Sequence, residues 1–199
     1  PAPKRVRSSA ASDVYKGRGL DGQVRAVNGA LPAALCASRR GLERLVLPRA
    51  NAEEAALAGG LAVYGVDSLG ETLSLLRSGF KAAPVVVDAE ALLAERAGTN
   101  SDLVDVHGQQ SARRALEIAA AGRHHMLMCG PPGAGKTMLA RRLPGLLPAL
   151  SVAEAMEVTT VHSVAGVAGG ALVTERPFRA PPHAVSGPGL VGGGGPGIR

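Results

Sequence analysis

Aromatic residues and cysteines are scarce in this chain. Its 199 residues include two Tyr, two Phe, two Cys and no Trp, so a core has to be built from aliphatic side chains within the hydrophobic content of 46%. Cys36 and Cys129 lie far apart in apolar contexts. This pattern excludes a disulfide-rich fold. It favours reduced, buried thiols of a cytoplasmic protein over a disulfide or a metal site.

Long apolar runs are also missing. No run is long enough to span a bilayer, which takes about 20 residues, and no signal peptide is visible. We therefore expect no membrane partner.

The net charge of +6 is unevenly distributed along the chain. Residues 1–18 contain five basic residues and one acidic residue, so they carry +4 of this charge. A terminal stretch of this kind is more often a solvated tail than a nucleic-acid surface. We predict a disordered basic tail over residues 1–19 and infer no nucleic-acid binding from net charge alone.

A glycine-rich stretch at residues 130–137 is the most informative motif present. It reads GPPGAGKT and fits the phosphate-binding loop pattern G-x-x-x-x-G-K-[ST]. Glycines let the backbone wrap around a polyphosphate, whose charge the loop N–H groups and the next helix start would face. Lys136 is expected to reach the β- and γ-phosphates, and the Thr137 hydroxyl to ligate Mg²⁺. The predicted ATP-binding residues are Gly130, Pro131, Pro132, Gly133, Ala134, Gly135, Lys136 and Thr137.

The flanks of this loop favour the same interpretation. The apolar residues 125–129 predict a buried strand, and residues 138–143 predict a helix that Pro144 ends. A glycine-rich turn beside an incidental lysine is the weaker alternative in this strand–loop–helix context.

An acidic residue is missing where a hydrolytic ATPase needs one. Such enzymes use a Walker B Asp at the end of a later strand to help hold Mg²⁺. No Asp follows Asp105, and the acids beyond the loop, Glu154, Glu157 and Glu175, do not end an apolar run. The chain also begins with Pro1. We expect a fragment of a longer protein that binds ATP weakly and holds no catalytic residue for hydrolysis.

Strand and helix signals alternate from about residue 20 to residue 80, which predicts a small α/β unit. Strands are expected at 42–47 and 61–66, and a capping box at Ser68 to Glu71 opens a helix. Residues 81–102 predict a linker with one short amphipathic stretch. The helix before the phosphate loop is expected to end at Gly122.

Four stretches in the second half resemble the ComM/YifB proteins, which are AAA+ ATPases related to the motor subunit of magnesium chelatase. These stretches are VHGQ at 106–109 through Leu146, HSVAG at 162–166, RPFRAP at 176–181 and GLVGGG at 189–194. One departure is the PPH sequence at 181–183, where the family usually has Pro-His-His.

The resemblance covers about residues 20–199 and implies an α/β fold in two parts. Residues 20–80 would be the C-terminal half of a Lon-protease-like domain, and residues 103–199 the N-terminal part of a P-loop AAA+ domain. In active Lon proteases a lysine follows paired glycines before the corresponding helix, and Leu31 stands there in this chain. A Ser–Lys dyad cannot be made from these residues, so no protease activity is expected.

The resemblance also implies a function and partners. It implies a cytoplasmic homo-hexamer that uses ATP and Mg²⁺ as a DNA helicase for branch migration, in recombination or natural transformation. Arg176, Phe178 and Arg179 fall where the family has a loop near the central pore, so they are candidate DNA contacts, with an ordinary basic loop as the alternative. Gly108 and Gln109 resemble the segment beside the adenine, with helix capping as the alternative.

Two other functions stay open at this point. One is a magnesium-chelatase-like ATPase that remodels a partner protein. The other is a nucleotide binder that hydrolyses nothing.

Overall fold

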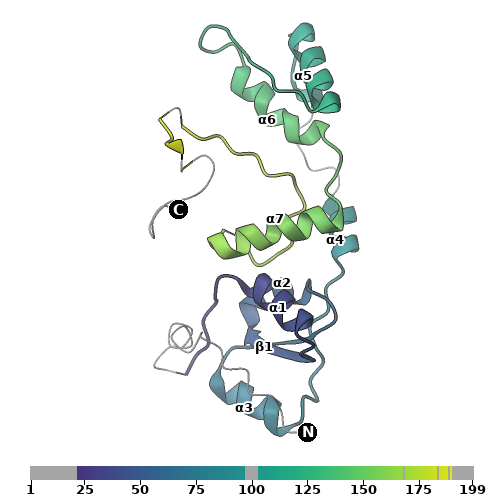
Figure 1. Ribbon diagram of the computed structural model, residues 1–199, viewed down its shortest axis with the longest axis vertical. Helices are drawn as coiled ribbons and strands as arrows, with labels where there is room; N and C mark the ends of the chain where they lie inside the picture. The colour runs from purple at the N-terminus through teal and green to yellow at the C-terminus, as the bar shows by residue number, and fades with distance from the viewer. Residues whose placement is uncertain (1–21, 97–102, 168, 183, 188, 190–199) are drawn as a thin grey trace. The chain divides into compact units, whose positions relative to one another are not determined.

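The computed structural model describes residues 22–96, 103–167, 169–182, 184–187 and 189 (Figure 1). These residues form a mixed α/β structure with seven α-helices and one small parallel sheet, which confirms the predicted fold class at that level. They divide into two units. One contains the described residues up to Ala89 with Met156–Leu172, and the other contains Glu90–Ala155 with the described residues from Val173 onward. The predicted tail at 1–19 and His183 lie outside the described residues.

The sheet of the first unit has two parallel strands. β1 (Arg44–Pro48) pairs with β2 (Ala62–Val66), and Arg44 lies opposite Ala62. The crossover between them contains η2 (Arg49–Asn51) and α2 (Ala52–Ala56), and α1 (Ala30–Arg39) precedes β1. Both strands lie where the sequence predicts them within one or two residues, and each is one residue shorter than expected.

Small side chains fill the core between these helices and the sheet. Its buried members are Ala34, Ala52, Ala55 and Val63. Because alanine is short, α1 and α2 can approach the strands closely, which suits a chain that is poor in aromatic residues. The few aromatics form a second cluster, in which the ring centroids of Tyr64 and Phe80 lie 5.1 Å apart.

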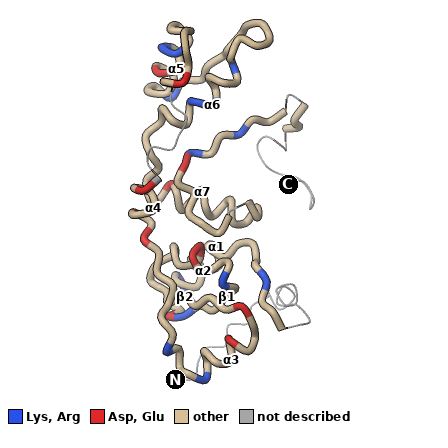
Figure 2. The backbone as a smooth tube through the Cα atoms, turned by 180° about the vertical axis from the view of Figure 1, so that it is seen from behind, with Lys and Arg blue, Asp and Glu red and all other residues tan. Residues whose placement is uncertain are grey.

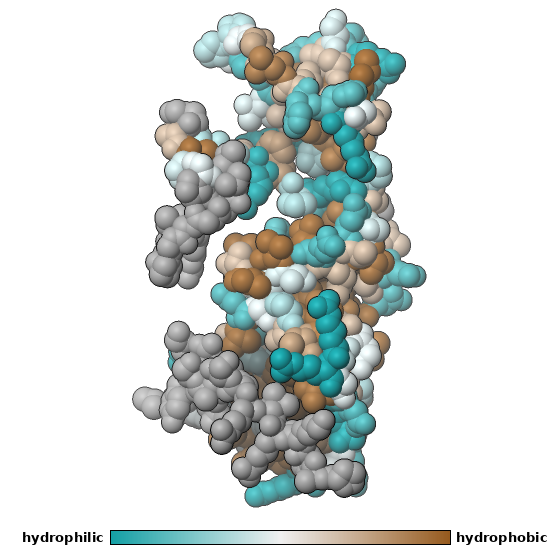
Figure 3. All heavy atoms as spheres, in the orientation of Figure 1, coloured by the Kyte–Doolittle hydropathy of each residue, from teal (hydrophilic) through white to brown (hydrophobic). Residues whose placement is uncertain are grey.

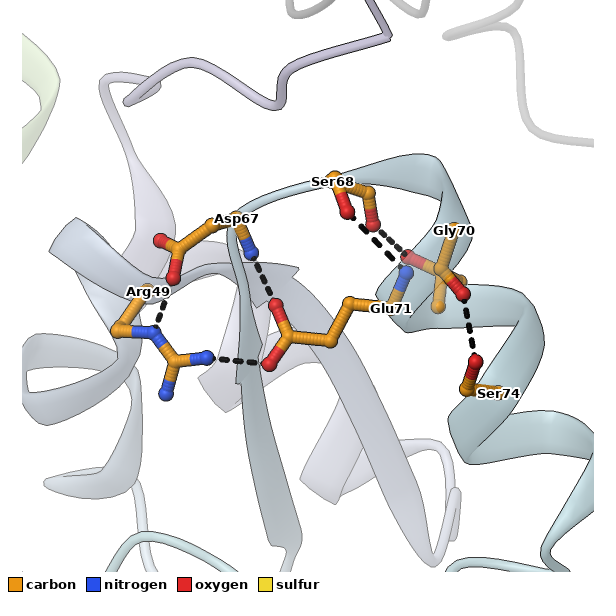
Figure 4. A network of polar contacts seen from close by, with 7 residues as sticks. Arg49, Asp67, Ser68, Gly70, Glu71 and Ser74 are labelled. Carbon is orange, nitrogen blue, oxygen red and sulfur yellow. Dashed lines mark hydrogen bonds and ion pairs between the residues drawn. The ribbon is translucent and has the colours of Figure 1, made fainter.

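The predicted capping box opens α3 (Leu69–Arg77), although only half of it forms. The Glu71 N–H donates to Ser68 Oγ at 3.2 Å, while the Glu71 carboxylate accepts from the Asp67 N–H at 2.7 Å. Arg49 from η2 donates to the carboxylates of both Asp67 and Glu71 (Figure 4). All three side chains of this network are exposed, so we expect it to contribute little to stability.

Gly65 leaves no room for a side chain inside β2. A Cβ there would lie 2.9 Å from the Ala52 Cβ and 3.0 Å from the Arg49 Cα. Since these atoms cannot rotate away, Gly65→Ala should lower the free energy of unfolding by about 1–3 kcal/mol. Gly70→Ala in α3 is the matched control, because its Cβ would meet Ser68 Oγ at an ordinary 3.8 Å. Urea unfolding followed by circular dichroism should show a lower midpoint for Gly65→Ala alone, and equal midpoints would contradict this account.

The second unit is mainly helical. It contains α4 (Ala89–Arg96), whose first residue ends the first unit, then η3 (Leu103–Asp105), α5 (Gln110–Gly122) and α6 (Lys136–Leu146). The helices α5 and α6 pack around a core whose buried residues are Leu103, Val106, Leu116 and Leu139. The phosphate-loop sequence connects this core to the start of α6.

The strand predicted at 125–129 is wrong for the described structure. These residues form neither helix nor strand, because no described segment of this unit lies beside them as a hydrogen-bonding neighbour. Met126 and Met128 still pack against the core, while Leu127 between them is 87% exposed. The alternation of a strand is therefore present without a sheet.

Two predicted helix ends also differ from the structure. Pro144 does not end α6, which continues to Leu146. Arg123, not Gly122, is the C-cap of α5, with a positive φ of 53°. Each shift amounts to one or two residues, which is the usual uncertainty at helix ends.

The helix α7 (Val152–Ala165) is apolar on more than one side. Ala155, Thr159 and Ser163 are buried, while Val161 and Val164 are 66% and 64% exposed. Figure 3 shows apolar side chains at the surface over this helix.

Candidate functional site

The glycine-rich loop at residues 130–137 turns sharply before α6, at the upper end of the view in Figure 1. Gly133 and Gly135 have positive φ angles of 80° and 76°, a conformation that favours glycine. No heavy atom lies within 4 Å of a Cβ built at Gly133. The loop therefore has the backbone shape and the open space that close approach of a polyphosphate requires.

Backbone N–H groups at the start of α6 are available to an anion. The first hydrogen bond back along this helix runs from the Leu139 N–H to the Gly135 carbonyl at 3.0 Å. The N–H groups of residues 135–138 donate to no backbone carbonyl in the part of the chain that the structure describes. Such amides, with the partial positive charge of a helix N-terminus, form a ready anion site.

Lys136 closes the loop with its side chain. Its Nζ donates to the carbonyl oxygens of Gly130 at 2.9 Å and Pro131 at 2.7 Å. The ammonium is thus held over the loop and carries a positive charge at the place where the sequence predicts phosphates. Thr137, the predicted Mg²⁺ ligand, is exposed in the first turn of α6. These residue types fit a nucleotide phosphate chain with its metal ion.

A depression of about 450 Å³ lies beside the loop. Its lining includes Gln109, Ala112, Met126, Met128, Lys136 and Leu139. The walls are mostly apolar and the polar groups come from the loop and from Gln109. This combination, an apolar pocket with a few convergent polar groups, is typical of a small-molecule site.

Gln109 makes a contact with the loop that the sequence does not indicate. Its Nε2 donates to the Ala134 carbonyl at 3.0 Å, so it contacts the loop itself. The sequence places Gly108 and Gln109 beside an adenine only through the family resemblance. Gln109 and Ala134 lie 25 positions apart in the sequence, so no local pattern indicates the hydrogen bond between them.

The candidate DNA contacts differ in their surroundings. Arg176 donates through Nε to the Pro148 carbonyl at 2.7 Å and forms an ion pair with Glu154 at 3.3 Å. Arg179 is exposed and makes no hydrogen bond or ion pair with the residues that the structure describes, and Phe178 is 42% exposed. Figure 2 shows basic positions along this extended segment after α7. Arg179 and Phe178 are thus accessible to a ligand, whereas the Arg176 guanidinium is already bonded to Pro148 and Glu154.

Glu154 is the anchor for Arg176. Its carboxylate accepts from the Ser151 N–H at 2.9 Å, and its own N–H donates to Ser151 Oγ at 3.3 Å, so the two residues form a capping box at the start of α7. The Ser151 N–H lowers the pKa of Glu154 below its ordinary value, and the charge of Arg176 lowers it further. The carboxylate is therefore ionised at neutral pH and can hold the arginine.

Side-chain exposure corrects one further expectation. Cys36 and Cys129 are free but exposed, so the prediction of buried thiols is wrong. Cys36 lies on the face of α1 opposite its buried residues. Leu31 is fully buried, with no exposed surface. Within the described ranges, no three His, Cys, Asp or Glu side chains gather as a possible metal site, and no helix could cross a membrane.

Comparison with known proteins gives consistent matches. A family model described as magnesium chelatase, subunit ChlI, matches residues 102–198. The competence protein ComM of Haemophilus influenzae is 43% identical over 177 residues, 88% of this chain and 35% of that protein. The uncharacterized protein YifB of Escherichia coli is 38% identical over 183 residues, 89% and 35% of the two chains. The uncharacterized protein Rv2897c of Mycobacterium tuberculosis is 51% identical over 177 residues, 88% and 34%. The chain spans about a third of the length of these relatives.

Proposed function

The chain belongs to the ComM/YifB family of magnesium-chelatase-like proteins, an AAA+ ATPase kind, and from this premise we propose that it is the ATP-binding part of a ComM-type motor. The observation that carries the proposal is the loop at 130–137 with its available amides and its lysine. A family model that covers residues 102–198 supports assigning 103–199 to the N-terminal part of an AAA+ domain. We assign 20–80 to a Lon-protease-like domain and 81–102 to a linker on the resemblance alone.

The loop residues have distinct roles in this proposal. The amides at the start of α6 bind the phosphate oxygens, and Lys136 transfers its hydrogen bonds from the carbonyls of Gly130 and Pro131 to the β- and γ-phosphates. Thr137 would hold Mg²⁺, which neutralises charge that builds up on the phosphates. Since no Walker B acid is recognisable among the 199 residues, we expect this chain to bind ATP without turning it over.

We further propose that the longer protein acts on DNA as a homo-hexameric branch-migration helicase in recombination or natural transformation. One relative is a competence protein, ComM of Haemophilus influenzae, which supports the link to natural transformation. The helicase activity and the hexamer rest on the family resemblance. Arg179 and Phe178 offer a cation and a stacking surface to a single strand. Arg176 supports them by fixing the segment to Glu154 and Pro148.

Salt dependence tests the arginine assignment. A side chain that neutralises one phosphate contributes about −0.7 to the slope of log K against log salt on single strands. Arg179→Ala in the longer protein should flatten this slope by about 0.7 per engaged subunit, without changing ATP affinity. Single-strand binding at several salt concentrations measures it, with deletion of residues 1–18 as the control for non-specific charge. An unchanged slope in Arg179→Ala, or a flattening caused only by the deletion, would remove Arg179 from the DNA site.

A second candidate is an ATPase that remodels a partner protein, which the match to a magnesium chelatase subunit favours. The experiment that separates the two is ATP hydrolysis by the longer protein with and without branched DNA. Stimulation by DNA together with movement of the branch supports the helicase. Hydrolysis that ignores DNA supports the second candidate.

A further inference from the structure

Two adjacent glutamines precede and begin α5, and they differ in one respect. Gln109 reaches the phosphate loop and donates from Nε2 to the Ala134 carbonyl at 3.0 Å. Gln110, the first residue of α5, is exposed and has no such contact. Gln110 can therefore serve as the matched control for substitutions of Gln109.

Helix capping does not account for Gln109. Its backbone is left-handed, with a φ of 49°, a conformation that residues other than Gly, Asn and Asp adopt with strain. Its side chain makes no capping hydrogen bond to α5. Glycine would adopt this backbone conformation without strain. The presence of a long amide side chain therefore indicates that the side chain has a role of its own.

The hydrogen bond fixes the direction of one peptide group. In a planar trans peptide the carbonyl and the next N–H point in opposite directions. Because Gln109 holds the Ala134 carbonyl, the Gly135 N–H points away from Gln109. A Cβ at Gly135 would lie 3.0 Å from the Gln109 Nε2, so a side chain there would displace the end of Gln109.

We propose that Gln109 is a positioning residue for the phosphate loop, and that it orients the Ala134–Gly135 peptide so that its N–H can serve a nucleoside triphosphate. This inference rests on the proposed ATP site and goes further, because it assigns Gln109 to phosphate binding and not to reading the base. The hydrogen bond from Gln109 orients an N–H that would bind phosphate, and phosphates are common to all nucleotides. Its loss should therefore weaken every polyphosphate ligand to the same degree.

Three variants of the 199-residue chain test this: Gln109→Met, Gln109→Gly and the control Gln110→Met. Gln109→Met keeps the length of the side chain without the donor, and Gln109→Gly also relieves the left-handed backbone. Both should raise the dissociation constants of ATP, GTP and inorganic tripolyphosphate by the same factor, about threefold to tenfold, as expected for one hydrogen bond. Gln110→Met should bind like the unaltered chain.

Hydrogen–deuterium exchange gives a readout that needs no ligand. Without nucleotide, the Ala134 amide, which donates to the Pro131 carbonyl at 3.3 Å, should exchange about threefold to tenfold faster in both Gln109 variants than in Gln110→Met. Loss of affinity for ATP alone would overturn the inference in favour of a base contact. Unaltered binding by Gln109→Gly, or unaltered exchange in both variants, would reduce Gln109 to a turn residue.

The outcome for the proposed function is separate. If the unaltered chain binds ATP and Lys136→Ala strongly weakens binding while the Gln109 variants bind normally, only this inference fails. If the unaltered chain binds none of the three ligands, the proposed function fails and this inference with it.

Discussion

Lys136→Ala is expected to weaken the binding of Mg-ATP about a hundredfold. A hydrogen bond from a charged donor contributes about 1.5–3 kcal/mol, and a factor of ten in affinity corresponds to about 1.4 kcal/mol. Lys136 also joins the two ends of the loop through hydrogen bonds to the carbonyls of Gly130 and Pro131. The variant therefore loses a positive charge and the hydrogen bonds that hold the loop ends together. Calorimetric titration of the 199-residue chain with Mg-ATP measures the effect.

Arg141→Ala is the matched control for this change. It removes one positive charge from the same helix, at an exposed position outside the loop. A loss of affinity confined to Lys136→Ala would show that the position of the charge matters. Equal losses in both variants would indicate general electrostatic attraction and would contradict a built phosphate site.

Leu31→Ala is expected to lower the free energy of unfolding of the first unit by about 2–5 kcal/mol, the usual range for removing a fully buried leucine. Leu31 has no exposed surface, and its N–H donates to the buried Glu54 carboxylate at 3.1 Å. The position that the family resemblance aligns with a catalytic lysine is therefore part of the core. Denaturant unfolding followed by circular dichroism measures the loss.

Leu73→Ala in α3 provides the comparison, because this leucine is 45% exposed and alanine favours a helix. It should change stability by less than about 0.5 kcal/mol. A small effect of Leu31→Ala, or caseinolysis by the chain that this substitution abolishes, would contradict a structural role for Leu31.

Local sequence patterns predicted the helices of this chain well. Each capping box marks the start of a helix in the structure, α3 after Ser68 and α7 after Ser151, because a hydroxyl and an N–H three residues on interact whatever the rest of the fold does. The turn at the phosphate-loop sequence was equally predictable, because Gly133 and Gly135 adopt the positive φ angles that favour glycine. The hydrogen bonds from Lys136 to the carbonyls of Gly130 and Pro131 were not predicted from the sequence.

Contacts between distant parts of the sequence were not predictable in this way. The partner of Arg176 is Glu154, 22 positions away, and the loop contact of Gln109 spans 25. Residues 125–129 alternate like a strand, but a strand also needs a neighbour, and periodicity cannot supply one. The apolar residues around Cys36 in the sequence predict a buried thiol, but Cys36 lies on the outer face of α1 and is exposed.

The most direct test of the central claim, that residues 130–137 bind the phosphates of a nucleotide, is to locate the binding site by nuclear magnetic resonance. Mg-ATP added to the isotope-labelled chain should shift the backbone amide signals of Gly133, Gly135, Lys136 and Thr137 most strongly, and inorganic tripolyphosphate should reproduce these shifts. Both sets of shifts should disappear in Lys136→Ala. Shifts centred on other residues, or none at saturating Mg-ATP, would contradict the claim.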